Sequence, residues 1–256
     1  MIIEEYYPDP EGRAHLYMRW RNKDGEVAEK TVSDFEPYFW IPQKTPTEFI
    51  KNVLRRYPGS RLESDDTATG LDGIELMKVV AHKPSDMFYM RKELRRTYEG
   101  DVRFPDRYLF DNVMMMPDWK PRIWHFDIEA VYVGSKKEMT TVICIYDSDS
   151  DFPVTFSWYE GAEKNSEMVE RNGLKYVHHL HESESDVHDH FLSYLESRNP
   201  DILIAHGAHF FDIPHLVRRL KHYKKLSPLG IVRRPPKGGN GYKACDQPIL
   251  GRIVFD

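Results

Sequence analysis

Three consecutive runs, IWHFDIEAVYV (123–133), TTVICIYDS (140–148) and PVTFSWYE (153–160), are rich in β-branched and aromatic residues and are separated by short polar stretches. This pattern predicts three strands of an antiparallel meander. Two segments follow: ESESDVHDHFLSYLESR (182–198), with apolar residues at helical spacing, and the apolar run DILIAHG (201–207). They predict an amphipathic helix and then a buried strand.

The pattern continues to residue 256. IPHLVRRLKHYKKL (213–226) predicts a second helix, and GRIVFD (251–256) predicts a further strand. Three antiparallel strands followed by α-β-α-β is the connectivity of a ribonuclease H-like sheet. We therefore expect a mixed α/β (α+β) fold of that kind, in which the first strand lies beside the strand that follows the first helix.

Residues 1–110 have a different pattern and predict a small, mixed, β-rich domain ahead of this sheet. Short strands are expected at 2–7, 15–20 and 26–32, and helices at 46–57 and 85–98. The predicted domains are therefore 1–110 and 111–256.

The composition excludes several protein classes. None of the 256 residues falls in an apolar run long enough to span a membrane, and MIIEEYYPDPEG at the amino terminus lacks the apolar core of a signal peptide. The two cysteines, Cys144 and Cys245, cannot form a disulfide framework, so a reducing compartment is expected. We expect a cytoplasmic protein (in the host cytoplasm if viral) that is not secreted and has no membrane partner.

The charge is unevenly distributed along the chain. Residues 213–256 carry ten Lys and Arg against two Asp, whereas residues 1–212 carry 26 Lys and Arg against 39 Asp and Glu. The basic cluster consists of Arg218, Arg219, Lys221, Lys224, Lys225, Arg233, Arg234 and Lys237. Such a cluster is compatible with a polyanionic partner such as a nucleic acid, and the alternative is a solvated helix face and loop.

Asp127 and Glu129 stand two residues apart in the first predicted strand of the sheet. Because side chains alternate between the faces of a strand, both carboxylates share one face, and Phe126 and Ile128 share the other. Buried carboxylates need a compensating positive charge, which a divalent cation with oxygen ligands supplies. The alternative is an ordinary solvated strand face.

Asp212 extends this pattern because it follows the predicted strand 201–207. Ligands of open α/β sheets gather at the carboxyl ends of strands. In a ribonuclease H-like sheet this strand neighbours the first one, which brings Asp212 near Asp127. Three carboxylates at one point are the arrangement that binds two divalent metal ions, and Mg²⁺ or Mn²⁺ fits oxygen ligands.

Zinc is the other metal to consider, because many of the 12 histidines fall between His178 and His222. His188 and His190 face different directions on a predicted helix, and neither a cysteine pair nor an H-E-x-x-H motif accompanies them. We expect these histidines to be surface or core residues.

The segments that carry these residues resemble a known family. HFDIEAVY (125–132) resembles the first exonuclease motif of family B DNA polymerases, and PDILIAHGAHFFDIPHL (200–216) resembles the second. Three further segments resemble flanking parts of those proteins in the same order: DFEPYFWIP (34–42), RRTYEGDVRFPDRYLFDN (95–112) and GRIVFD (251–256). The likeness covers almost the whole chain and implies an N-terminal domain followed by a 3′→5′ exonuclease domain.

The resemblance also implies a role for each site residue in proofreading during DNA replication. Asp127 would bind both metal ions, Glu129 one of them and Asp212 the other. Together they would hydrolyse the last phosphodiester of a single-stranded 3′ end. Phe211 would lie against the 3′-terminal nucleotide.

Two features depart from the family pattern. Gly207 replaces an Asn that helps to hold the single strand, and His206 or His209 is the candidate to take its place. The third motif, Tyr-x-x-x-Asp, should follow GRIVFD, where the sequence stops. Tyr242 and Asp246 have its spacing but precede that strand, so we interpret them as coincidental. We therefore expect the rest of a polymerase as a partner, in cis or as a second chain.

The sequence leaves three functions open. The expected one is the proofreading portion of a family B DNA polymerase, acting on a single-stranded 3′ end or a primer-template. The first alternative is a catalytically incomplete DNA-binding or assembly module, which Gly207 and the missing third motif favour. The second is a stand-alone ribonuclease H-like nuclease or another metal-dependent hydrolase, against which the polymerase-like residues 1–110 argue.

Overall fold

The computed structural model describes the chain except for residues 9–11, 114–116, 134–136 and 234–246. Its contacts divide it into two compact units. The first contains residues 1, 3–18 and 29–117, and the second contains residues 2, 19–28 and 118–256. Among the described residues, none of the helices combines the length and the apolarity that a membrane crossing requires.

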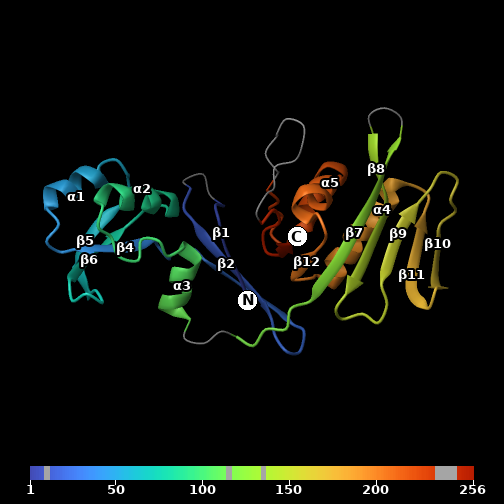
Figure 1. Ribbon diagram of the computed structural model, residues 1–256, viewed down its shortest axis with the longest axis horizontal. Coiled ribbons are helices and arrows are strands. Elements are labelled where there is room, and N and C mark those ends of the chain that lie inside the picture. Colours follow the sequence, from blue (N-terminus) through green and yellow to red (C-terminus); the bar gives the residue numbers. More distant parts are fainter. Residues whose placement is uncertain (9–11, 114–116, 134–136, 234–246) are drawn as a thin grey trace. The chain divides into compact units, whose positions relative to one another are not determined.

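The amino-terminal part contains two small three-stranded sheets (Figure 1). One has the order β1-β2-β3, with strands Ile2–Tyr6, His15–Arg21 and Val27–Val32, and the other has the order β4-β6-β5, with strands Tyr38–Pro42, Glu75–Val80 and Arg61–Thr69. The expected strands at 2–7, 15–20 and 26–32 are confirmed. Strand β5 was not predicted, because its sequence RLESDDTAT has no apolar alternation.

Three helices accompany these sheets: α1 (Thr47–Leu54), α2 (Pro84–Leu94) and α3 (Phe104–Asn112). The first two are shorter than the expected 46–57 and 85–98, and α3 was not predicted. In α2 the apolar residues Met87, Met90 and Leu94 recur every three to four positions and pack in one cluster with residues of α1, β4 and β6. This cluster is the core of the first unit.

The second unit is built on a seven-stranded sheet with the order β10-β11-β9-β8-β7-β12-β13. Its strands are β7 (Ile123–Val133), β8 (Lys137–Asp147), β9 (Val154–Trp158), β10 (Asn165–Arg171), β11 (Leu174–His181), β12 (Ile202–Ile204) and β13 (Ile253–Phe255). Strands β7, β8 and β9 form the expected antiparallel meander. Strand β12 runs parallel to β7, with Ile204 opposite His125, so the predicted ribonuclease H-like neighbours are confirmed.

The hairpin β10–β11 was not predicted. Strand β10 has the polar sequence NSEMVER and lies at the edge of the sheet, so backbone pairing with β11 holds it rather than burial of an apolar face. The predicted helix 213–226 is also wrong in extent. It divides into α5 (Ile213–Arg219) and a 3₁₀ turn, η2 (Tyr223–Leu226).

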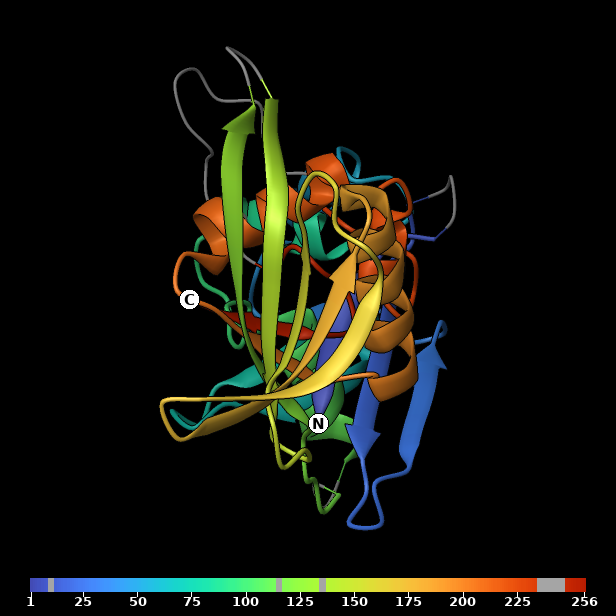
Figure 2. The same ribbon diagram turned by 90° about the vertical axis from the view of Figure 1, so that its right-hand side faces the viewer.

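Helices α4 (Glu184–Arg198) and α5 cover one face of this sheet. In Figure 2 the green and yellow strands lie in front of the orange helices. Helix α4 begins at Ser183, whose hydroxyl accepts a hydrogen bond from the Asp186 amide, and ends at Asn199 in the left-handed conformation. Its apolar residues, Val187, Phe191, Leu192 and Leu195, pack with Trp124, Phe126 and Ile128 of β7.

Candidate carboxylate site

Asp127 and Glu129 lie on the face of β7 that the helices do not cover. Both side chains are exposed, whereas Phe126 and Ile128 are 7% and 4% exposed. This is the alternation that a two-residue period predicts. Strand β7 therefore presents two carboxylates on one accessible face, while its other face anchors it to the core.

Asp212 is placed by an unusual turn. Residues Ala208–Asp212 form a single π-helical turn, η1, between β12 and α5. The carbonyl oxygen of Gly207 accepts hydrogen bonds from the backbone amides of Phe210, Phe211 and Asp212, at 3.1, 2.7 and 3.3 Å. Isolated π turns occur frequently at functional sites, and nothing in the local periodicity predicts one.

The Asp212 carboxyl group is buried, and its surroundings disfavour its ionised form. It is 1% exposed, and its Oδ2 atom has no hydrogen-bond partner among the described residues. Burial, together with the negative charge of Asp127, raises the pKa of Asp212 to about 7, although backbone amides of Asp212 and Ile128 oppose the shift. The fold thus brings Asp127 and Asp212 within electrostatic reach of each other.

Asp256 joins this cluster, and the sequence analysis missed it. Its Oδ1 atom accepts a hydrogen bond of 2.6 Å from the Gly207 backbone amide, and its charge also raises the pKa of Asp212. A signal was present in the sequence: Asp256 directly follows strand β13, which runs parallel to β12. The carboxyl ends of parallel strands meet at one edge of the sheet.

The residue types fit a divalent cation. Asp212 offers a buried oxygen without a partner, and a cation beside it would relieve the repulsion from Asp127. Glu129 shares the face of Asp127. In the described part of the chain, however, no three His, Cys, Asp or Glu side chains are placed together as ion ligands. The electrostatic interaction between Asp127 and Asp212 is therefore the part of the expected ligand set that the structure brings together.

The two phenylalanines of the turn differ in exposure. Phe211 is half-buried and stacks on the imidazole of His215, with ring centroids 5.4 Å apart and an interplanar angle of 23°. Phe210, which the sequence analysis did not select, is 56% exposed. His209 is half-buried, and its Nε2 atom has no partner among the described residues. The predicted DNA contacts Gly207, His209 and Phe211 thus all lie on or beside the turn of Asp212.

Gly207 is required by backbone conformation rather than by space. Its φ of +89° is in the left-handed region, and an added Cβ would meet its nearest neighbours at an ordinary 3.9 Å. We expect Gly207→Ala to lower the free energy of unfolding by about 1–2 kcal/mol. Gly207→Asn should cost less, because Asn tolerates left-handed backbone. Urea unfolding of both variants checks this, and equal losses would contradict it.

Parts of the basic cluster have structural partners. Arg219 pairs with the buried Glu184, Arg218 hydrogen-bonds Glu138 at 3.2 Å, and Lys225 pairs with Glu196 at 3.1 Å. Arg234 and Lys237 lie outside the described residues, as do Tyr242 and Asp246. These ion pairs reduce the positive charge that the cluster can offer to a polyanion.

The histidines of α4 and β11 form packing contacts. His181 is 2% exposed, and its Nε2 lies 3.2 Å from Nδ1 of His190, whose ring also packs against His179. Burial lowers the pKa of all three, which favours neutral rings in the core.

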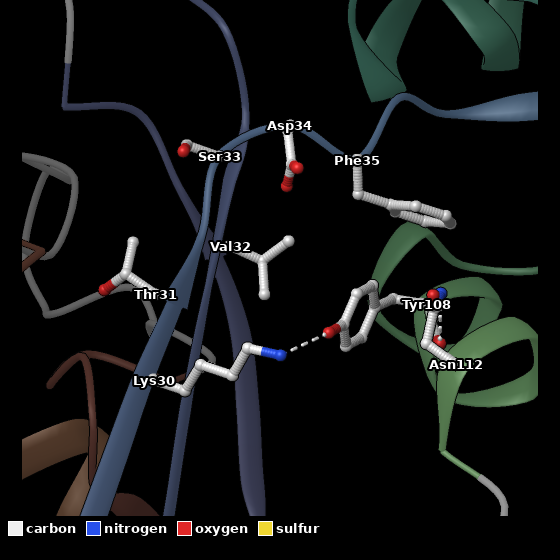
Figure 3. Close-up of a pocket in the computed structure, with 8 residues that line it drawn as sticks. All are labelled: Lys30, Thr31, Val32, Ser33, Asp34, Phe35, Tyr108 and Asn112. Atoms are coloured by element: carbon white, nitrogen blue, oxygen red, sulfur yellow. Dashed lines mark hydrogen bonds between the residues drawn. The ribbon is translucent and has the colours of Figure 1, made fainter.

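The first unit has a pocket of its own, with a volume of about 490 Å³ (Figure 3). It is lined by Lys30, Thr31, Val32, Ser33, Asp34, Phe35, Tyr108 and Asn112. Figure 3 shows the Lys30 side chain directed at the Tyr108 hydroxyl, to which its Nζ donates at 3.1 Å. With Asp34 as its single carboxylate, this pocket lacks the paired acids of the site on β7.

The chain is similar to known DNA polymerases. Residues 120–245 match the exonuclease domain of DNA polymerase family B. Over its whole length the chain is 24% identical to a DNA polymerase of Pyrococcus glycovorans and 25% identical to one of Thermococcus sp. (strain 9oN-7), and it covers 33% of each. It covers 15% of a third relative, the DNA polymerase of Thermococcus sp. (strain GE8), at 25% identity. The chain thus spans about a third or less of these relatives.

The fold has a solved counterpart. The structure of the family B DNA polymerase from the hyperthermophilic archaeon Pyrobaculum calidifontis superposes with a TM-score of 0.64 and 17% sequence identity, over 99% of this chain and 36% of that one. This likeness concerns the fold. Together the comparisons confirm the resemblance that the motifs indicate.

Proposed function

Because the chain belongs to the family B DNA polymerases, with residues 120–245 as its exonuclease domain, we propose that it carries their proofreading activity. The proposed reaction is 3′→5′ hydrolysis of the terminal phosphodiester of single-stranded DNA, with a nucleoside monophosphate as product. The observation that carries this proposal is the buried Asp212 carboxyl beside Asp127, whose Oδ2 atom has no hydrogen-bond partner among the described residues. In the same proposal, residues 1–110 are the N-terminal polymerase domain, and residues 111–256 are the exonuclease domain.

Each residue would have a distinct part in this reaction. Asp127 and Asp212 would hold two Mg²⁺ or Mn²⁺ ions with the help of Glu129. When bound, these ions generate a nucleophile from water and neutralise charge on the phosphate. Asp212 must lose its proton to act as a ligand, so cation affinity should rise with pH through about 7.

The aromatic turn would hold the substrate. Phe211 would lie against the 3′-terminal nucleotide, since bases stack on aromatic rings in single-strand binding sites. Gly207 and His209 would line the path of the strand. The face of β7 is acidic, so the phosphate of the DNA would approach it only with cations present.

The activity can be tested with a 5′-labelled single-stranded oligonucleotide in Mg²⁺ or Mn²⁺. We expect a ladder that shortens from the 3′ end. Asp127→Asn should slow it at least about a hundredfold, because the electrostatic groups of such sites contribute on that order. Glu170→Gln is the matched control, since Glu170 pairs with Lys175 on the exposed hairpin β10–β11. An unchanged ladder with Asp127→Asn would refute the assignment.

A second candidate is a DNA-binding module that needs the rest of a polymerase for catalysis. It is favoured because, among the described residues, no three His, Cys, Asp or Glu side chains are placed together as ion ligands. It predicts no ladder in the same assay, but measurable binding of the labelled strand.

A further inference from the structure

A buried hydrogen-bond network connects β8, α4 and α5 to the turn that carries Phe211. We propose that His215, in the middle of this network, is a positioning residue that holds the Phe211 ring in place for the 3′-terminal nucleotide. This inference rests on the proposed function and names a further residue on which substrate binding depends.

The rings of Phe211 and His215 are in stacking contact but differ in burial. The His215 side chain is completely buried, whereas Phe211 is only half-buried. The rings stack at 5.4 Å and 23°, so the fixed imidazole supports one side of a ring that is partly open to solvent. A ring supported in this way loses less rotational freedom when a base stacks on it.

Thr140 fixes His215 in turn. Its hydroxyl lies 2.9 Å from Nε2 of His215 and 2.9 Å from Nε2 of His188, and Thr140 is completely buried. On β8 the core residues are Ile143 and Ile145, so strict alternation would turn Thr140 away from the helices. A β-bulge opposite Glu129 and Ala130 shifts the register by one residue and brings Thr140 to the helix side.

The two hydrogen bonds are compatible with neutral imidazoles. The Thr140 hydroxyl has one hydrogen and two acceptor lone pairs, so it can donate to one ring and accept an N–H from the other. Burial lowers the pKa of His188 to about 4 and lowers that of His215, which is consistent with this arrangement.

Two carboxylates, those of Glu184 and Glu138, lie at the two ends of this hydrogen-bond network. Glu184 accepts hydrogen bonds from the Thr140 backbone amide at 2.8 Å and from Arg219 at 3.0 Å. On the other side, Nδ1 of His215 lies 3.7 Å from Glu138, which also accepts from Arg218. His215 is thus held by a connected set of side chains from β8, α4 and α5. Of the two central histidines, His215 is the one whose ring is found stacked on Phe211 in the described residues.

Two variants of His215 separate its two contacts. His215→Gln keeps a hydrogen-bonding group for Thr140 but has no ring, and His215→Phe keeps a ring but loses the hydrogen bond. His188→Gln is the matched control, because it perturbs the same Thr140 hydroxyl without touching Phe211. The dissociation constant of the whole chain for a labelled single-stranded oligonucleotide is measured by fluorescence anisotropy in Ca²⁺. The melting temperature is recorded in parallel.

We expect His215→Gln to weaken DNA binding about three- to tenfold, in line with the strength of an aromatic pair. His215→Phe, which keeps the ring but loses the Thr140 hydrogen bond, should weaken binding less than His215→Gln, and His188→Gln should stay within about twofold of the unchanged protein, even where their melting temperatures fall. Unchanged binding by His215→Gln, or equal weakening by His188→Gln, would overturn the inference. If the unchanged protein neither binds nor degrades the strand, the proposed function itself fails, and the inference with it.

Discussion

Replacing Asp201 with alanine is expected to lower the free energy of unfolding by about 3–5 kcal/mol. Asp201 is completely buried at the start of β12, and its carboxylate accepts hydrogen bonds from Nε of Arg19 at 3.1 Å and of Arg21 at 2.7 Å. It also accepts the backbone amide of Arg122 at 2.9 Å. Removing this carboxylate takes away the buried negative charge that the guanidinium groups of Arg19 and Arg21 share.

The matched control is Asp118→Ala. Asp118 pairs with Lys23 at 2.6 Å, but both side chains are about three-quarters exposed, so this ion pair should contribute less than about 1 kcal/mol. Guanidinium chloride unfolding of both variants gives the comparison. Equal, small losses would mean that the buried guanidinium groups find other partners, and the ion cluster would then not be a main source of stability.

This cluster also shows the limit of what the sequence could predict. Arg19 and Asp201 are 182 positions apart, and nothing local in HLYMRWR or in NPDILI marks them as partners. A charged residue in a predicted strand is ordinarily assigned to the solvent face. Only the folded chain shows that two strands far apart in sequence place these charges together in the interior.

The central sheet was more predictable because its signals are local and periodic. Alternation in IWHFDIEAVYV correctly put Asp127 and Glu129 on one face, and the order of elements correctly put β12 beside β7. The bulge in β8 and the π turn before α5 have no periodic signal. The bulge sets the position of Thr140, and the π turn sets the positions of Phe211 and Asp212.

Asp212→Asn is expected to make the metal-free protein more stable at pH 8 while it removes the proposed exonuclease activity. The folded protein holds the Asp212 proton up to about pH 7, whereas the unfolded chain releases it near pH 4. The folded state of the unchanged protein therefore loses stability as pH rises from about 4 to 7, and the full penalty remains above that range. Asparagine does not titrate, so this penalty is absent from the variant.

The size of the effect follows from the same shift. Each factor of ten in proton affinity corresponds to about 1.4 kcal/mol, so the variant should gain as much as about 4 kcal/mol at pH 8 and almost nothing at pH 4. Urea unfolding in EDTA between these pH values measures the gain, and Asp151→Asn at an exposed position should stay within about 0.5 kcal/mol throughout.

The nuclease assay measures the accompanying loss of the proposed activity. In Mg²⁺ or Mn²⁺ the Asp212→Asn variant should degrade the labelled strand at least about a hundredfold more slowly, since its amide cannot supply the charge that a cation ligand needs. A variant that is more stable but inactive indicates that the Asp212 carboxylate destabilises the folded protein and is needed for activity. A variant that is less stable at pH 8 but fully active would show that Asp212 is an ordinary structural residue.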